Sequence, residues 1–201
     1  MQNIAEEWLG GQFNELHPLL QDLHRNPSTL TGQVEVSFGR GLAGTLGKRI
    51  ASRLGVPIIS GEHTLEVSIY GDGGVLHWVR SFDGQSRFHS EFKPVGRYPS
   101  GHWVERSGAL TLLLDVRVVS GGWHWVHRST KLFGIALPQA FLPATVASKS
   151  IDRGLYRFSV EVGVPALGKL FGYSGTLAAN PSAEGALPAV RTHAGVSKHA
   201  G

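Results

Sequence analysis

The spacing of apolar residues along the 201-residue chain changes after the first third. Over residues 13–24, Phe13, Leu16, Leu19, Leu20 and Leu23 recur at the spacing of one helical face. Pro18 interrupts this pattern and Asn26-Pro27 ends it. The segment is therefore predicted to be a short, broken amphipathic helix.

Residues 33–54 predict a strand followed by a second helix. Val34 and Val36 alternate with Glu35 and Ser37, as in a strand with one exposed face. Over residues 42–54, leucine or isoleucine occupies every fourth position, which predicts a helix that ends at Gly55.

From residue 62 to about residue 178 the period is two, and the apolar runs are separated by turns of hairpin length, such as residues 71–74. About nine strands result. The predicted fold class is α+β and β-rich: a curved antiparallel meander, either a half-barrel or a barrel, with two helices from the N-terminal half packed on it. We expect one domain over residues 1–179 and a disordered tail over residues 180–201, which holds mainly small and polar residues.

The amino-acid composition excludes several kinds of functional site. The chain has no cysteine, which excludes disulfides, zinc–thiolate sites and cysteine nucleophiles. Neither a signal peptide nor an apolar run long enough for a membrane span is recognisable, so we expect a cytoplasmic protein. The net charge is +4, but the basic residues are scattered, so nucleic-acid binding is not predicted.

Gly39, Gly41 and Gly44 have the G-x-G-x-x-G spacing of a dinucleotide-binding turn. Such a turn follows a strand that is buried on both faces, whereas Glu35 and Ser37 give this strand a polar face. Further strand–helix–strand units, which a dinucleotide crevice needs, are also missing. We therefore predict no cofactor, and expect the glycines to form a strand-to-helix corner, with Gly44 letting the helix approach the sheet closely.

The tripeptide His-Trp-Val occurs three times, beginning at His77, His102 and His124. Three imidazoles could form an open metal site. On a strand, however, each histidine points away from its neighbouring tryptophan. Tryptophans that face the core would turn the histidines outward, so no metal site is predicted.

Two charged residues share a strand face with aromatic residues. Arg80 lies between Trp78 and Phe82, and Glu105 shares its face with Trp103. Charges that face an apolar interior are costly unless they are paired. We hypothesise an Arg80–Glu105 pair; the alternatives are that local twist carries both to solvent, or that they orient a ligand. The sequence holds no recognisable catalytic motif.

Several blocks of the strand region carry a family resemblance: Trp78-x-Arg80-x-Phe82, Leu132-Phe133-Gly134-Ile135, Phe158-x-Val160-x-Val162 and Tyr173-x-Gly175. Together they resemble the bacterial family called domain of unknown function 4166, over residues 9–178. The resemblance implies no activity and no catalytic residues. Because family members often follow a saccharopine-dehydrogenase-like domain, it does imply an oxidoreductase partner.

The function that we predict is non-enzymatic: the concave face of the sheet binds an apolar or amphipathic small molecule. One alternative is an accessory domain that docks on a dehydrogenase-like partner, and a second is an enzyme that uses charged cavity residues. A large apolar cavity favours small-molecule binding, and a filled core with an exposed apolar patch favours the accessory domain. A cavity in which charged groups converge favours the enzyme. The candidate cavity residues are Trp78, Arg80, Phe82, Trp103, Glu105, Arg128, Phe158 and Tyr173.

Overall fold

A computed structural model describes residues 3–85, 87–136 and 144–181 of the chain. Three helical segments come first: α1 (Ile4–Leu9), the 3-10 helix η1 (Gly10–Glu15) and α2 (Pro18–Arg25). The remaining elements are β1 (Ser28–Phe38), α3 (Gly41–Arg53), β2 (Gly61–Asp72), β3 (Val75–Phe82), β4 (Arg87–Val95), β5 (His102–Ser107), β6 (Leu110–Val119), β7 (Gly122–Leu132), β8 (Ile135–Ala136), β9 (Ala144–Asp152), β10 (Leu155–Val164) and β11 (Gly168–Pro181).

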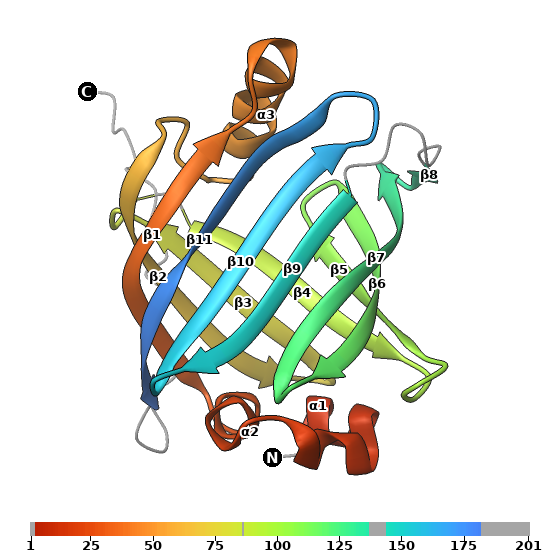
Figure 1. The fold of residues 1–201 in the computed structure, drawn as a ribbon. Coiled ribbons are helices and arrows are strands. Elements are labelled where there is room, and N and C mark those ends of the chain that lie inside the picture. The colour runs from red at the N-terminus through yellow and green to blue at the C-terminus, as the bar shows by residue number, and fades with distance from the viewer. Residues whose placement is uncertain (1–2, 86, 137–143, 182–201) are drawn as a thin grey trace, which may run out of the picture.

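Ten of the strands form a closed antiparallel barrel (Figure 1). Each barrel strand pairs with the barrel strand before it and the one after it. The last strand, β11, closes the barrel by pairing with the full length of β1. The short strand β8 lies outside the barrel ring and pairs antiparallel with the last two residues of β7. The predicted β-rich antiparallel meander is confirmed, and the barrel, not the half-barrel, is the form that it takes. Closure pairs every strand on both sides and leaves no open sheet edge among the ten.

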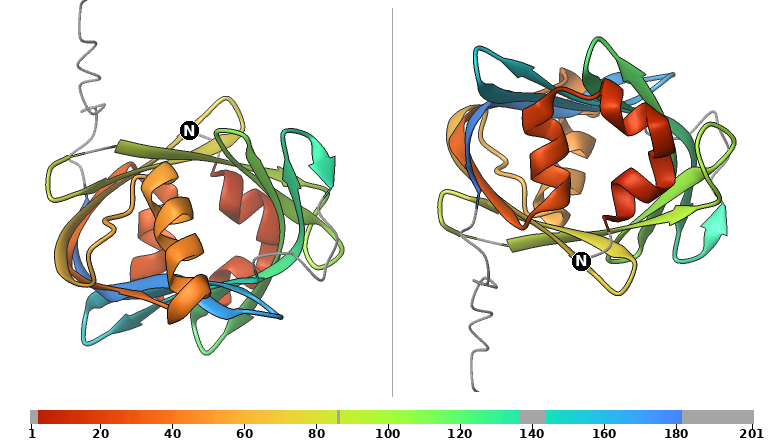
Figure 2. Two further views of the ribbon diagram at one scale, coloured as in Figure 1. Left: turned by 90° about the horizontal axis from the view of Figure 1, so that it is seen from above. Right: turned by 90° about the horizontal axis from the view of Figure 1, so that it is seen from below.

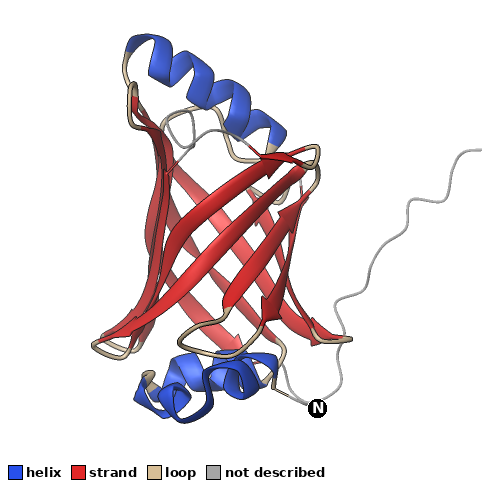
Figure 3. Ribbon diagram, turned by 90° about the vertical axis from the view of Figure 1, so that its right-hand side faces the viewer, coloured by secondary structure: helices blue, strands red, loops and turns tan. Residues whose placement is uncertain are grey.

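The helices lie at the two ends of the barrel (Figure 3). Helices α1 and α2, joined by η1, fill one end, which we call the plugged end, and α3 crosses the other, which we call the α3 end (Figure 2). Trp8, Phe13, Leu20 and Leu23 of the plugged end are almost completely buried. Burial of these large apolar side chains attaches the N-terminal segment to the barrel.

The predicted broken helix over residues 13–24 takes a different form. Pro18 does not interrupt a helix but begins α2, where its missing N–H costs no hydrogen bond. The residues before it form η1, and α1 was not predicted. Asn3 caps α1 by accepting hydrogen bonds from the backbone N–H groups of Ala5 and Glu6. Six residues are too few to show a clear helical period.

The G-x-G-x-x-G segment forms the corner between β1 and α3. Strand β1 is antiparallel to both of its neighbours, β2 and β11, so the segment belongs to no parallel strand–helix–strand unit. The close contact of α3 with the sheet comes from Gly47, whose added Cβ would overlap the Leu170 carbonyl oxygen, and not from Gly44. Gly44 instead approaches the Gly39 carbonyl oxygen within the corner itself.

The C-terminal boundary lies slightly later than predicted. Strand β11 continues to Pro181, and Asn180 still pairs with Thr29 of β1. The remainder of the predicted tail, residues 182–201, lies outside the described residues.

Candidate functional site

The barrel encloses a cavity of about 950 Å³ between the plugged end and α3. Its wall is mainly apolar and includes Phe92, Leu112, Trp125, Phe158 and Phe171. These side chains come from strands all around the barrel, because every second residue of a barrel strand faces inward. The core of the protein is therefore not completely filled by its own side chains.

The cavity reaches the surface at the α3 end. Leu46 of α3, Gly108 of the β5–β6 turn and Phe133 of the β7–β8 turn all belong to its lining, and all three are exposed. Phe133 is 80% exposed. These residues mark an apolar entrance between α3 and the strand turns.

The structure places the eight predicted cavity residues in three different surroundings. Five line the cavity: Trp78, Arg80, Glu105, Phe158 and Tyr173. Phe82 and Trp103 point inward but are packed away from it. Phe82 lies against Tyr173, and Trp103 fills the space between Trp8 and two other tryptophans.

Arg128 is the one predicted cavity residue that lies on the outside of the barrel, so that prediction is wrong. Strand alternation puts it on the face opposite Trp123 and Trp125, which are buried. The β6–β7 register also shifts at this point, with His127 paired to Leu114 and Ser129 to Leu113. Arg128 forms a half-exposed ion pair with Asp115, with 3.3 Å between Nε and Oδ2.

Arg80 and Glu105 both face the interior but do not form the direct ion pair that was hypothesised. Two serines lie between them. The Arg80 guanidinium donates a hydrogen bond of 3.0 Å to Ser90 Oγ, which lies 2.8 Å from Ser107 Oγ. Ser107 Oγ in turn donates to a Glu105 carboxylate oxygen over 3.3 Å. Sequence reasoning missed both serines, although Ser90 lies on the same strand face as Phe88 and Phe92.

Lys149 on β9 is a second basic residue in the wall, and it was not predicted. Only 2% of the residue is exposed. The His24 ring of α2 donates from Nδ1 to the Leu20 carbonyl oxygen over 2.7 Å, so Nε2 carries a lone pair. Lys149 Nζ donates to this Nε2 over 2.7 Å, which ties the plugged end to the barrel wall.

Burial lowers the pKa of both partners. For His24, burial is the larger cause and the nearby Lys149 charge adds to it. For Lys149, burial again comes first and the Arg80 charge second. Both effects follow from the cost of a charge in a dry, already positive environment.

Aromatic rings surround the two cations. The Lys149 Nζ lies 4.3 Å from the ring centroid of Trp123 and 4.8 Å from that of Trp78. The Arg80 guanidinium also lies over Trp78, 5.4 Å from the ring centroid. The indole Nε1 of Trp78 is buried and has no hydrogen-bond partner among the described residues. The indole Nε1 atoms of Trp103 and Trp123 are likewise buried and have no hydrogen-bond partner among the described residues.

Two tyrosines complete the polar part of the wall. Tyr156 and Tyr173 line the cavity, and burial raises the pKa of both phenols. They remain neutral and can donate or accept hydrogen bonds. Apart from Glu105, the polar groups near the cations are donors or neutral hydroxyls.

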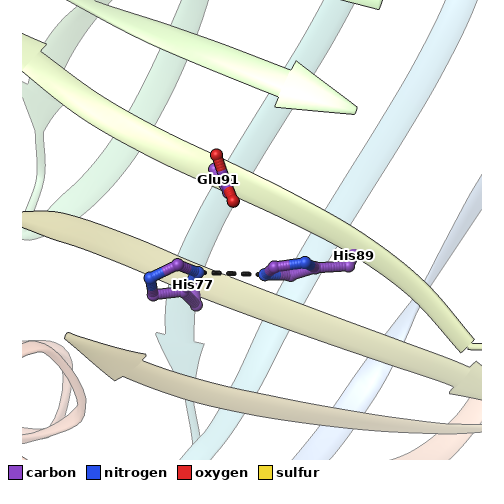
Figure 4. A group of neighbouring side chains, drawn as sticks. All are labelled: His77, His89 and Glu91. Carbon is purple, nitrogen blue, oxygen red and sulfur yellow. Dashed lines mark hydrogen bonds between the residues drawn. The ribbon is translucent and has the colours of Figure 1, made fainter. Parts of the chain in front are cut away.

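The three histidines of the His-Trp-Val repeats point away from the cavity, as predicted, while their tryptophans are inside. Among the described residues, His77 is the one of these three histidines that belongs to a group of possible metal ligands. On the outer face of β3 and β4 it lies beside His89 and Glu91, and one ligand atom of each residue lies within 4.8 Å of the others (Figure 4). Sequence reasoning did not consider this group, because it requires the β3–β4 register.

Taken together, the fold and the cavity define a closed antiparallel β-barrel with a mainly apolar interior into which two cations project. None of the described helices has the length and apolar character needed to cross a membrane. Residues 16–177 match the family described as a domain of unknown function, DUF4166, and the chain belongs to this family. No curated protein matches the chain.

Proposed function

We propose that the barrel binds an amphipathic small molecule whose head group is an anion, such as the carboxylate of a fatty acid. The observation that carries this proposal is the pair of basic side chains, Arg80 and Lys149, in a mainly apolar cavity. Among the described residues, neither forms an ion pair with a carboxylate. A bound anion would neutralise them, and burying a cation without such a partner is expensive.

The volume and lining of the cavity support a ligand with a large apolar body. A space of about 950 Å³ lies near the upper end of the range of about 300–1,000 Å³ that is typical of small-molecule pockets. The apolar wall would contact the body, while few polar groups fix its orientation. The apolar entrance at the α3 end suggests that the molecule enters the cavity past Leu46 and Phe133.

The head group would be held beside Arg80 and Lys149, which both lie over the Trp78 ring. Arg80 has guanidinium N–H groups beyond the one that contacts Ser90. Charge-assisted hydrogen bonds to a carboxylate are stronger than those to a neutral hydroxyl. An acid is therefore expected to bind more tightly than the alcohol of the same length.

The other functions considered from the sequence have less support. An accessory domain for a dehydrogenase-like oxidoreductase would be expected to have a filled core, and this core contains a large cavity. An enzyme that uses converging charged groups would be expected to have its acid and base in contact. Here Glu105 is separated from Arg80 by Ser90 and Ser107.

Native mass spectrometry of the untagged protein, followed by organic extraction, tests the proposal. The expected result is a co-purified apolar acid whose mass is lost on extraction. Adding dodecanoate to the extracted protein should then restore a complex with one dodecanoate per chain. An extracted protein that takes up no dodecanoate would contradict the proposal.

A further inference from the structure

We propose that His77, His89 and Glu91 bind a divalent transition metal ion, with Zn²⁺ as the best match, on the outer surface of the barrel. The three residues alternate with inward-facing residues of β3 and β4 and so belong to the outward face, and of the three only His89 is also among the residues that line the cavity. Nothing in the proposed ligand binding requires this group.

The β3–β4 register brings the three residues together. His77 is the direct cross-strand partner of Glu91, and His89 precedes Glu91 by two residues on β4. Residues two apart on a strand share a face, and direct cross-strand partners lie side by side. The three side chains thus form a compact triangle on two rigid, neighbouring strands (Figure 4).

The ligand atoms are already close to the spacing that a metal requires. His77 Nδ1 and His89 Nε2 are 2.9 Å apart, and the atoms of all three residues lie within 4.8 Å of one another. Zinc–nitrogen bonds of about 2.0–2.1 Å in a tetrahedron separate two nitrogens by about 3.3 Å. The imidazoles would separate slightly, and the proton that they share would move to a ring nitrogen facing solvent.

The surroundings keep His77 in place and favour a cation. Its ring is stacked on Tyr70, with 4.9 Å between the ring centroids and an angle of 16° between the planes. Burial and the neighbouring His89 lower the pKa of His77, while the negative charges of Glu91 and Asp72 act in the opposite direction and favour a cation there. Arg106, the β5 neighbour of Glu91, is the one opposing charge paired with the group by register, and it makes no ion pair with Glu91 among the described contacts.

The donor set fits zinc. Two imidazole nitrogens and one carboxylate oxygen are common zinc ligands, and three protein ligands leave the fourth tetrahedral position for water. Harder ions such as Mg²⁺ prefer sets made of oxygen atoms. Binding would also cross-link β3 to β4 on the barrel exterior.

Isothermal titration of untagged, EDTA-treated full-length protein with ZnCl₂ tests the site, and Co²⁺ absorption reports its geometry. We expect one strong site per chain, with the intense visible bands of tetrahedral Co²⁺. His77→Ala and His89→Ala should each weaken zinc binding by at least about tenfold, and Glu91→Gln should weaken it less.

His102→Ala is the matched control, because His102 occupies the same place in its own His-Trp-Val repeat, faces outward and lies outside the group. It should bind zinc as the unchanged protein does. Circular dichroism in EDTA checks that each variant is folded. Zinc binding that is absent from the unchanged protein, or that His77→Ala leaves intact, would overturn the proposal.

Discussion

The buried His24–Lys149 contact predicts that the protein loses stability in acid. His24 stays neutral in the folded protein because burial and Lys149 lower its pKa. In the unfolded chain the histidine has its ordinary pKa of about 6.5. Protonation therefore favours the unfolded state: the stability that His24 contributes is complete above about pH 6.5 and is lost as the pH falls toward the folded-state pKa.

The size of this loss follows from the proton linkage. Each pH unit below the unfolded pKa costs about 1.4 kcal/mol while the folded state excludes the proton. Between about pH 6.5 and about pH 5 the loss is about 2 kcal/mol. Elsewhere, His63 acts in the opposite direction, because its hydrogen bond to Asp83 raises its pKa and favours the folded state in acid.

Comparison with His24→Gln separates this contribution from those of the other histidines. The glutamine side chain stays neutral, so the variant should lose about 2 kcal/mol less than the unchanged protein between about pH 7.5 and about pH 5. Urea unfolding at both pH values, followed by tryptophan fluorescence, measures the difference. The control is His124→Gln on the barrel exterior, which should behave like the unchanged protein. Equal losses of stability in acid for His24→Gln and the unchanged protein would show that His24 is not the source of the acid sensitivity.

Three further substitutions test other parts of the structure. Gly47→Ala should destabilise the protein by about 1–3 kcal/mol in urea unfolding, because the new methyl group overlaps the Leu170 carbonyl oxygen, whereas Ser52→Ala on the exposed face of α3 should not. Ser90→Ala should cost about 1–3 kcal/mol by the same measurement, since it leaves buried hydrogen-bonding groups without their partner. Arg128→Ala should leave dodecanoate affinity unchanged in a calorimetric titration. A loss of affinity would show that Arg128 does contribute to ligand binding.

The fold was largely predictable because apolar residues recur at every second position in most of its strands. Alternating residues identified the strands, and short turns identified their antiparallel order. Closure was not predictable, because it depends on the pairing of β1 with β11, whose residues lie far apart in the sequence. The helix α1 was missed because six residues carry little periodic signal.

The site was predictable only where a charged residue interrupts an aromatic face. Arg80 and Glu105 could be found in this way, but the serines between them required the register of three strands. Lys149 was missed because its inward face on β9 carries no aromatic residue to mark it, although Ala147 and Ile151 share that face. Its partner His24 lies 125 residues away on α2, beyond any local pattern.

The most direct test of anion binding compares dodecanoate with dodecanol by titration calorimetry on the extracted full-length protein. We expect dodecanoate to bind at least about tenfold more tightly than dodecanol, an advantage of about 1.4 kcal/mol from charge-assisted contacts. Arg80→Met, which keeps an apolar side chain at this position, should remove most of that advantage without abolishing dodecanol binding. Equal affinities for the acid and the alcohol in the unchanged protein would contradict recognition of an anionic head group.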